Sequence, residues 1–190
     1  MDYILQCLLI ASPVLLAGIA FIIFLKKDYF SWLKTPVDFG MKFRGKRLLG
    51  ENKTLRGFVI MPLATWIAVI MIGYLMKFFN FESGKALFDY SLSGSYKALA
   101  YGMAYPLGEL PNSFIKRQLN INPGERAHGD LARVFFNFLD KTDSLLMCGI
   151  AVFLLYGISA NYILGAIILG LLFHYLTDFL MLKQGLKKEV

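Results

Sequence analysis

Charged residues are scarce in this chain of 190 residues. Only 17% of the residues are Asp, Glu, Lys or Arg, whereas 57% are hydrophobic. Soluble domains usually contain about 25% charged and about 45–50% apolar residues. The shortage of charge therefore argues against a soluble domain. Long apolar runs instead suit a lipid bilayer, whose hydrocarbon core of about 30 Å is crossed by a helix of about 20 residues.

The sequence also lacks the marks of several common protein classes. Its two cysteines, Cys7 and Cys148, lie in apolar runs with no cysteine or histidine nearby at metal-ligand spacing, so we interpret both as small buried hydrophobic residues. There is no glycine-rich Walker loop of the form G-x-x-x-x-G-K-S/T. The net charge of +7 comes without a basic patch interleaved with aromatic residues, which argues against a nucleic-acid binder.

Five apolar segments predict an all-α, polytopic integral membrane protein. They cover residues 3–25, 58–79, 97–115, 145–157 and 162–182. The first is too long for a signal-peptide core, so we interpret it as a retained span. The third is interrupted by Pro106 and Glu109. The fourth, with 13 residues, is short for a span and could tilt in a thinned bilayer or be re-entrant. We expect one domain over residues 1–190.

The distribution of lysine and arginine predicts the orientation of the chain. Residues 26–57 hold nine of them, residues 116–141 five and residues 183–190 three, whereas residues 77–97 hold three and residues 157–162 none. With five spans, one side of the membrane carries 17 and the other 3. The positive-inside rule then places the N-terminus outside and the C-terminus in the cytoplasm, with two cytoplasmic loops at about 26–57 and 112–144.

The first of these loops carries a group of polar and cationic residues flanked by glycine. Its sequence is Gly50-Glu51-Asn52-Lys53-Thr54-Leu55-Arg56-Gly57. Glycine lets the backbone approach a ligand closely, and lysine and arginine donate charge-assisted hydrogen bonds to phosphate oxygens. The candidate phosphate-binding residues are Asn52, Lys53, Thr54 and Arg56. The alternative is a basic topology signal that contacts anionic lipid headgroups.

The second loop opens with a further set of polar residues. Ser113, Lys116 and Arg117 are spaced three to four residues apart and would share one face of a helix. Glu109 lies just inside the apolar region. A carboxylate there is energetically costly, and it more often has a function than not. The alternative for Glu109 is an ion pair with Lys116 or Arg117.

Two aspartates follow at the start of the fourth segment. Asp140 and Asp143 are three residues apart and could share a hard divalent cation such as Mg²⁺. The alternative is capping of a helix N-terminus, for which aspartate is also favoured. Together with the cationic loops, the pair indicates a cytoplasmic site for a metal-bound polyphosphate.

One more polar pair lies in the fifth segment. His174 and Asp178 are one helical turn apart and would share a face. Such a pair inside a span is expected to face the protein interior, either as a structural pair or as a further part of the site.

Four of these motifs occur in an order known from one enzyme group. They are Asn52-Lys53-Thr54-x-Arg56-Gly57, Ser113-x-x-Lys116-Arg117, Pro123-Gly124 and Asp140-x-x-Asp143. The chain resembles membrane CTP-dependent cytidylyltransferases: most closely the CDP-archaeol synthase family and, more distantly, phosphatidate cytidylyltransferase. It departs from that pattern at Glu109, where the family usually has aspartate, and at Lys141, where glutamine or arginine is expected.

The resemblance implies a reaction and roles for the candidate residues. A lipid phosphate, either an archaeal-type ether lipid phosphate or phosphatidic acid, would react with CTP to give a CDP-activated lipid and pyrophosphate. Mg²⁺ would be held by Asp140, Asp143 and Glu109. The phosphates would be bound by Lys53, Arg56, Lys116 and Arg117, and the nucleotide or lipid phosphate would be oriented by Asn52, Thr54 and Ser113. The small number of spans favours a homodimer.

Other classes of function stay open at this stage. A non-catalytic membrane protein could use the same loops to bind lipid headgroups, and a degenerate relative would tolerate substitution of Asp140 and Asp143. A small transporter subunit would have polar residues through several spans, whereas here they concentrate toward the cytoplasmic ends.

Overall fold

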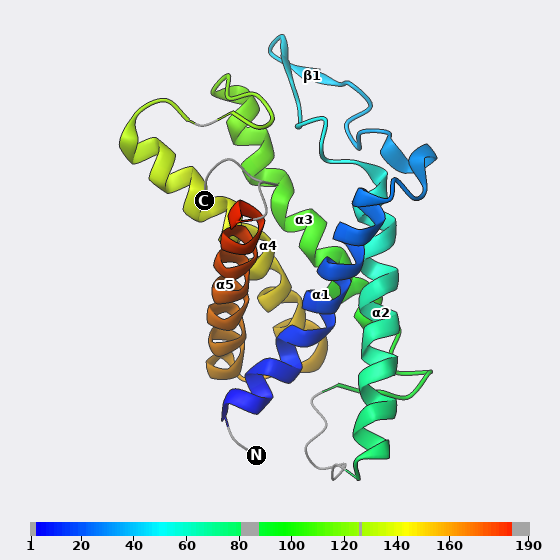
Figure 1. Ribbon diagram of the computed structural model, residues 1–190. Helices are drawn as coiled ribbons and strands as arrows, with labels where there is room; N and C mark the ends of the chain where they lie inside the picture. Colours follow the sequence, from blue (N-terminus) through cyan, green and yellow to red (C-terminus); the bar gives the residue numbers. More distant parts are fainter. Residues whose placement is uncertain (1–2, 81–87, 126, 184–190) are drawn as a thin grey trace.

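The computed structural model describes residues 3–80, 88–125 and 127–183, except for the side chains of residues 178 and 180–182. This part of the chain contains five long α-helices: α1 (Tyr3–Lys26), α2 (Leu55–Phe78), α3 (Lys97–Gln118), α4 (Asp130–Tyr156) and α5 (Ala160–Lys183). Successive helices run in alternating directions (Figure 1). The predicted all-α class is confirmed.

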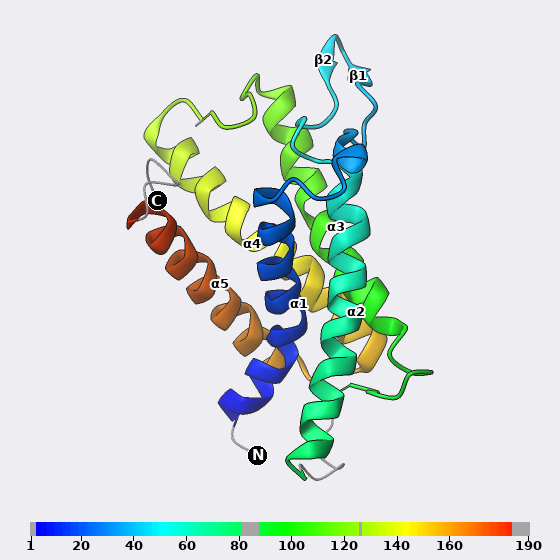
Figure 2. The same ribbon diagram turned by 45° about the vertical axis from the view of Figure 1, so that its right-hand side comes forward.

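The helices pack as a closed ring. Each contacts the next along the chain, and α5 returns to contact α1, as the turned view also shows (Figure 2). In the described part, three segments are long and apolar enough to cross a membrane: Tyr3–Lys26, Leu55–Phe78 and Ala160–Thr177. These segments confirm a membrane protein with several spans.

The interior of the ring is built from small and medium apolar side chains. Every helix contributes to the same buried cluster, whose members include Cys7, Met61, Tyr101, Cys148 and Ala166. Both cysteines are buried and free, as predicted. Large apolar side chains point outward from the same helices, among them Ile23, Met71 and Leu172. Outward-facing side chains of this kind are expected where lipid replaces water.

α3 runs without a break through the positions that the sequence marks as an interruption. Pro106 and Pro111 both lie inside it, as does Glu109. A proline inside a soluble helix costs about 3 kcal/mol because it removes a backbone hydrogen bond. In a helix ring, packing on both sides can hold the helix together across such a position. The interruption of the apolar pattern therefore does not interrupt the helix.

α4 is much longer than the apolar segment within it. It has 27 residues and begins at Asp130, fifteen residues before Leu145, where the apolar segment starts. At a rise of 1.5 Å per residue it is about 40 Å long, which is ample for a tilted span. Because α3 also continues to Gln118, only residues 119–129 connect the two helices, and most of the segment 112–144 is helical.

The segment between α1 and α2 has a compact structure of its own. A short 3-10 helix, η1 (Ser31–Lys34), precedes a hairpin of β1 (Lys42–Phe43) and β2 (Lys46–Arg47). The two residues of the hairpin turn, Arg44 and Gly45, both have positive φ (52° and 79°). That conformation suits a two-residue hairpin and is easy for glycine.

Asp38 holds this segment together. Its buried carboxylate accepts hydrogen bonds from Nη2 and Nε of Arg47 at 3.1 and 3.2 Å, and from the backbone N–H groups of Leu49 and Gly40 at 3.0 and 3.1 Å. Burial by itself would raise the pKa of Asp38, but these hydrogen bonds outweigh it and keep the pKa below its ordinary value. Asp38 thereby fixes the chain that leads into residues 50–54.

Candidate active site

A polar pocket of about 380 Å³ lies at the end of the ring where α3 ends and α4 begins. One wall comes from the segment before α2, one from the second half of α3, one from residues 122–125 with Ala127, and one from the first half of α4. The lining includes Asn52, Lys53, Glu109, Asn112, Ser113, Lys116, Arg117, Asn122, Arg133, Phe136, Asn137, Asp140 and Asp143.

The pocket unites most of the residues singled out from the sequence. Eight of the ten candidates line it, and they come from three separate parts of the chain: Asn52, Lys53, Glu109, Ser113, Lys116, Arg117, Asp140 and Asp143. Residues as far apart in the sequence as Asn52 and Asp143 thus face one cavity.

Thr54 and Arg56 do not line the pocket. Thr54 is the residue before α2, and its extended backbone pairs with Pro36. The Arg56 side chain is buried, and its Nη2 lies 3.0 Å from Oδ1 of Asp28. Asp28 is also paired with Lys34 at 2.7 Å. Arg56 thus fastens the end of α1 to the start of α2.

Gly108 allows the close approach of α3 and α4 on which the site depends. A Cβ atom at this position would lie 2.7 Å from the carbonyl oxygen of Asp143 and 2.8 Å from Cα of Ser144. These neighbours are backbone atoms that cannot move aside. The absence of a side chain therefore brings the α3 face that carries Glu109 and Asn112 against the aspartates of α4.

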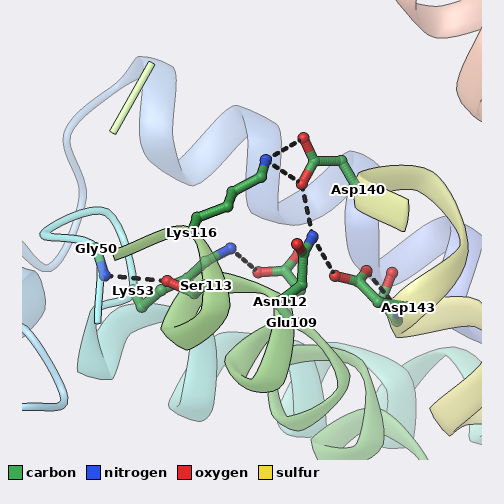
Figure 3. A network of polar contacts seen from close by, with 9 residues as sticks. Gly50, Lys53, Glu109, Asn112, Ser113, Lys116, Asp140 and Asp143 are labelled. Atoms are coloured by element: carbon green, nitrogen blue, oxygen red, sulfur yellow. Dashed lines mark hydrogen bonds and ion pairs between the residues drawn. The ribbon is translucent and has the colours of Figure 1, made fainter. Parts of the chain in front are cut away.

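Asn112 bridges the two aspartates (Figure 3). Its Nδ2 donates to Oδ1 of Asp140 at 2.7 Å and to Oδ2 of Asp143 at 3.0 Å. The side chain is only 4% exposed, and its Oδ1 is buried without a hydrogen-bond partner among the described residues. The two carboxylates thus converge on one amide.

Two ion pairs also lie at the site. Nζ of Lys116 lies 2.6 Å from both carboxylate oxygens of Asp140, and Nζ of Lys53 lies 2.5 Å from Oε2 of Glu109 (Figure 3). The sequence predicted Lys116 or Arg117 as the alternative partner of Glu109, whereas the structure shows Lys53. Each pair joins a candidate phosphate-binding cation to a candidate metal-binding carboxylate.

Ser113 joins the first loop to α3. Its Oγ accepts a hydrogen bond from the backbone N–H of Gly50 at 3.0 Å (Figure 3). A Cβ at Gly50 would lie 2.5 Å from Oδ1 of Asn52, so the loop is tightly folded here. This contact positions Lys53 beside Glu109.

Arg117 offers cationic donors that the protein itself does not use. Its Nε and Nη1 are buried and have no hydrogen-bond partner in the described part of the chain. An unpaired buried donor is costly unless a ligand satisfies it. Because Arg117 lines the pocket, an anion bound there would supply the missing acceptors.

The aspartates sit at positions that exclude helix capping. Asp140 lies ten residues inside α4 and Asp143 one turn further, whereas capping involves only the first turn. Among the described residues, no group of three His, Cys, Asp or Glu side chains converges to hold a metal ion. The carboxylates of Asp140 and Asp143 still supply the hard oxygen ligands that suit Mg²⁺, which often takes its remaining ligands from water and substrate phosphates.

Several lining residues were missed from the sequence, notably Asn112, Arg133 and Asn137. They follow helical spacing with known candidates: Asn112 lies between Glu109 and Lys116, and Arg133 and Asn137 precede Asp140 by seven and three residues. Treating residues 112–144 as a loop concealed this periodicity.

Two further sequence features lie away from the pocket. Lys141 is buried and does not line it; its ammonium group sits 3.9 Å from the centre of the Tyr175 ring. His174 stacks on Tyr105 with ring centres 6.5 Å apart. The side chain of Asp178, the predicted partner of His174, lies outside the described part of the structure.

Comparison with known proteins gives a consistent result. The family model described as CarS-like CDP-archaeol synthase matches residues 1–190. A CDP-archaeol synthase of Pyrococcus furiosus is 31% identical over 93% of this chain and 87% of the relative, and one of Pyrobaculum islandicum is 33% identical over 83% and 82%. One of Thermofilum pendens is 29% identical over 92% of this chain and 75% of the relative. No solved structure matches the chain. The chain belongs to the CarS-like CDP-archaeol synthase family.

Proposed function

We propose that this protein transfers the cytidylyl group of CTP to the phosphate of an archaeal-type lipid and releases pyrophosphate. The observation that carries the proposal is the convergence of Lys53, the Ser113–Arg117 turn and the Asp140–Asp143 pair on one pocket at the end of an apolar helix ring. Family membership supports the same reaction. A pocket at the membrane boundary gives a water-soluble nucleotide and a lipid headgroup a common meeting place.

The transfer requires in-line displacement at phosphorus. An oxygen of the lipid phosphate attacks the α-phosphorus of CTP, and the bond from that phosphorus to the oxygen bridging to the β-phosphate breaks. The electron pair leaves with pyrophosphate. Catalysis of this kind consists mainly of positioning and of neutralising charge, so no covalent intermediate with the protein is needed.

The cations of the pocket would hold the reacting phosphates. Arg117 has unused donors that a bound phosphate would satisfy, and Lys53 and Lys116 would exchange a carboxylate for phosphate oxygens. Ser113 and Asn52 are placed to orient the nucleotide or the lipid phosphate. Charge accumulating on the leaving pyrophosphate is stabilised by the same fixed cations.

Asp140 and Asp143 would hold Mg²⁺, with Glu109 close by in the same pocket. When bound, the ion would neutralise phosphate charge and align the nucleotide for displacement. Two carboxylates match the usual mode of Mg²⁺ binding in phosphoryl-transfer sites, where substrate oxygens complete the coordination. Lys116 would then be freed from Asp140 to bind phosphate.

We further propose that the pocket faces the cytoplasm, with the N-terminus outside. The support is the excess of lysine and arginine in the segments at the pocket end of the ring. CTP would reach the pocket from the cytoplasm, and the lipid would arrive laterally from the bilayer. A homodimer stays a prediction from the small number of spans.

The reaction can be tested by pyrophosphate release from detergent-purified protein given CTP, Mg²⁺ and a lipid phosphate. An unsaturated ether-lipid phosphate and phosphatidic acid are supplied in separate reactions. We expect release that requires lipid, is faster with the ether lipid and falls about 100- to 1,000-fold in Asp143→Asn, the scale seen when a charge-stabilising catalytic group is lost.

The control is Asn161→Asp, at the exposed start of α5 and remote from the pocket, which should retain full release. Release without added lipid would mean hydrolysis of CTP. Folded protein that releases no pyrophosphate with either lipid would contradict the proposed reaction and favour headgroup binding without catalysis.

A further inference from the structure

Asn112 lies where the two aspartates converge. Its amide nitrogen faces them, whereas a cation at this place would require the amide oxygen. Its Nδ2 contacts both Asp140 and Asp143, while its Oδ1 is buried and has no hydrogen-bond partner among the described residues. Buried amide oxygens are normally satisfied, so an orphan at 4% exposure calls for a ligand. The arrangement fits a site in its cation-free form.

The physical need for a donor here is clear. Two carboxylates held close together repel one another unless positive charge or hydrogen-bond donors lie between them. In the ligand-free chain this need is met by Nδ2 of Asn112 and, at Asp140, by Nζ of Lys116. A divalent cation would remove the need for both.

We propose that Asn112 is a third oxygen ligand of the divalent cation and that its amide turns over when the cation binds. Nδ2 bridges the aspartates when the site is empty of a cation, and Oδ1 joins their carboxylates when one is present. The inference rests on the proposed function, since that reaction supplies the reason for a cation here.

The identity of the side chain agrees with this double role. Asparagine has a donor and an acceptor on one short planar group and can exchange them by rotation about Cβ–Cγ. Aspartate would serve only the cation-bound state, and lysine only the cation-free state. Leucine, of similar size, would serve neither. The three oxygens, two carboxylate and one amide, form a hard donor set suited to Mg²⁺ or Mn²⁺.

These differences define the experiment. Mn²⁺ binding is measured by electron paramagnetic resonance on the detergent-purified full chain, with and without CTP, for the wild type, Asn112→Leu, Asn112→Asp and the remote control Asn161→Leu. Thermal unfolding of each is recorded with and without Mn²⁺.

We expect Asn112→Leu to weaken Mn²⁺ binding about 10- to 100-fold, the usual loss when a residue supporting a metal site is removed. Asn112→Asp should retain Mn²⁺ binding. Without the ion it should melt at a lower temperature than the wild type, because three carboxylates then repel one another. Its melting temperature should rise more on addition of Mn²⁺ than that of the wild type. Asn161→Leu should match the wild type throughout.

Two results would overturn the inference and are distinguishable. If the wild type binds Mn²⁺ and folded Asn112→Leu binds it equally well, Asn112 is only a structural bridge, and the proposed transfer is unaffected. If the wild type binds no Mn²⁺ with or without CTP, the cation site itself is refuted; lipid-dependent pyrophosphate release from the same preparation then decides separately whether the transferase function stands.

Discussion

At the scale of single residues, the pocket is a set of charges that compensate one another before any ligand arrives. Lys116 neutralises Asp140 and Lys53 neutralises Glu109, at distances of 2.6 and 2.5 Å. Arg117 differs from the two lysines, because its buried Nε and Nη1 have no partner in the described part of the chain. The residue that already has free donors is therefore the first we expect an incoming phosphate to meet.

This difference gives a prediction for Arg117→Gln. Loss of charge-assisted hydrogen bonds to phosphate costs about 1.5–3 kcal/mol, so kcat/KM for CTP should fall roughly 10- to 150-fold. The measurement is pyrophosphate release at varied CTP. Lys77→Gln removes a cation from the far end of α2 and should leave kcat/KM unchanged. Equal kinetics for Arg117→Gln and the wild type would show that the guanidinium does not touch phosphate.

At the scale of elements, the contact of α3 with α4 sets the distances within the site. Gly108 meets backbone atoms of Asp143 and Ser144, so a methyl group there must push the helices apart. Gly18, in α1, has open space around its would-be Cβ atom. The two glycines thus provide the same substitution with opposite packing consequences.

We predict that Gly108→Ala lowers cytidylyl transfer by at least about 100-fold, because catalysis by positioning is sensitive to shifts of about 1 Å. Gly18→Ala should retain activity and gain up to about 1 kcal/mol of helix stability. Initial rates and detergent-phase thermal unfolding would be recorded for both. Full activity in Gly108→Ala would mean that the pocket does not depend on this close approach.

The Asp38–Arg47 contact holds the first loop together, as the close approach at Gly108 holds α3 against α4. Because the pKa of folded Asp38 lies below its ordinary value, its contribution to stability is present above about pH 4 and is lost as the pH falls through the folded pKa. Asp38→Asn should lower stability by roughly 1.5–3 kcal/mol at neutral pH, the range for hydrogen bonds to a charged group. The deficit relative to the wild type should shrink under acid, as followed by thermal unfolding from pH 7 to pH 3. A constant deficit across that range would contradict the assignment.

The elements also show what the sequence can and cannot reveal. Apolar runs located α1, α2 and α5 to within a few residues, because lipid-facing helices must be apolar on most sides. α4 was predicted only from Leu145, since its first half carries the polar residues of the pocket and so lacks an apolar pattern. The roles of Arg56 and Asn112 depend on the approach of distant segments, which no local pattern records.

At the scale of the whole molecule, the alternating helices place all pocket segments at one end of the ring (Figures 1 and 2). Lysine and arginine concentrate at the same end, and the opposite connections carry few. In the proposed orientation, the basic segments that orient the chain would also supply the cations of the pocket.

The orientation can be checked with introduced cysteines, since both native cysteines are buried. A membrane-impermeant maleimide applied to intact cells should label Ser93→Cys, and Ser31→Cys should be labelled only after lysis. Both positions are exposed, and they lie at opposite ends of the ring. The reverse labelling pattern would place the pocket outside the cell.

The central claim is that this pocket joins the α-phosphorus of CTP to a lipid phosphate. The most direct test follows two labels, with α-³²P-CTP and γ-³²P-CTP supplied in parallel to purified protein with Mg²⁺ and an ether-lipid phosphate. The account predicts that the α label enters the organic phase as CDP-lipid while the γ label is released as pyrophosphate, and that Asp143→Asn abolishes both. Lipid labelled by γ-³²P-CTP, or CTP cleaved with no label in the lipid, would contradict it.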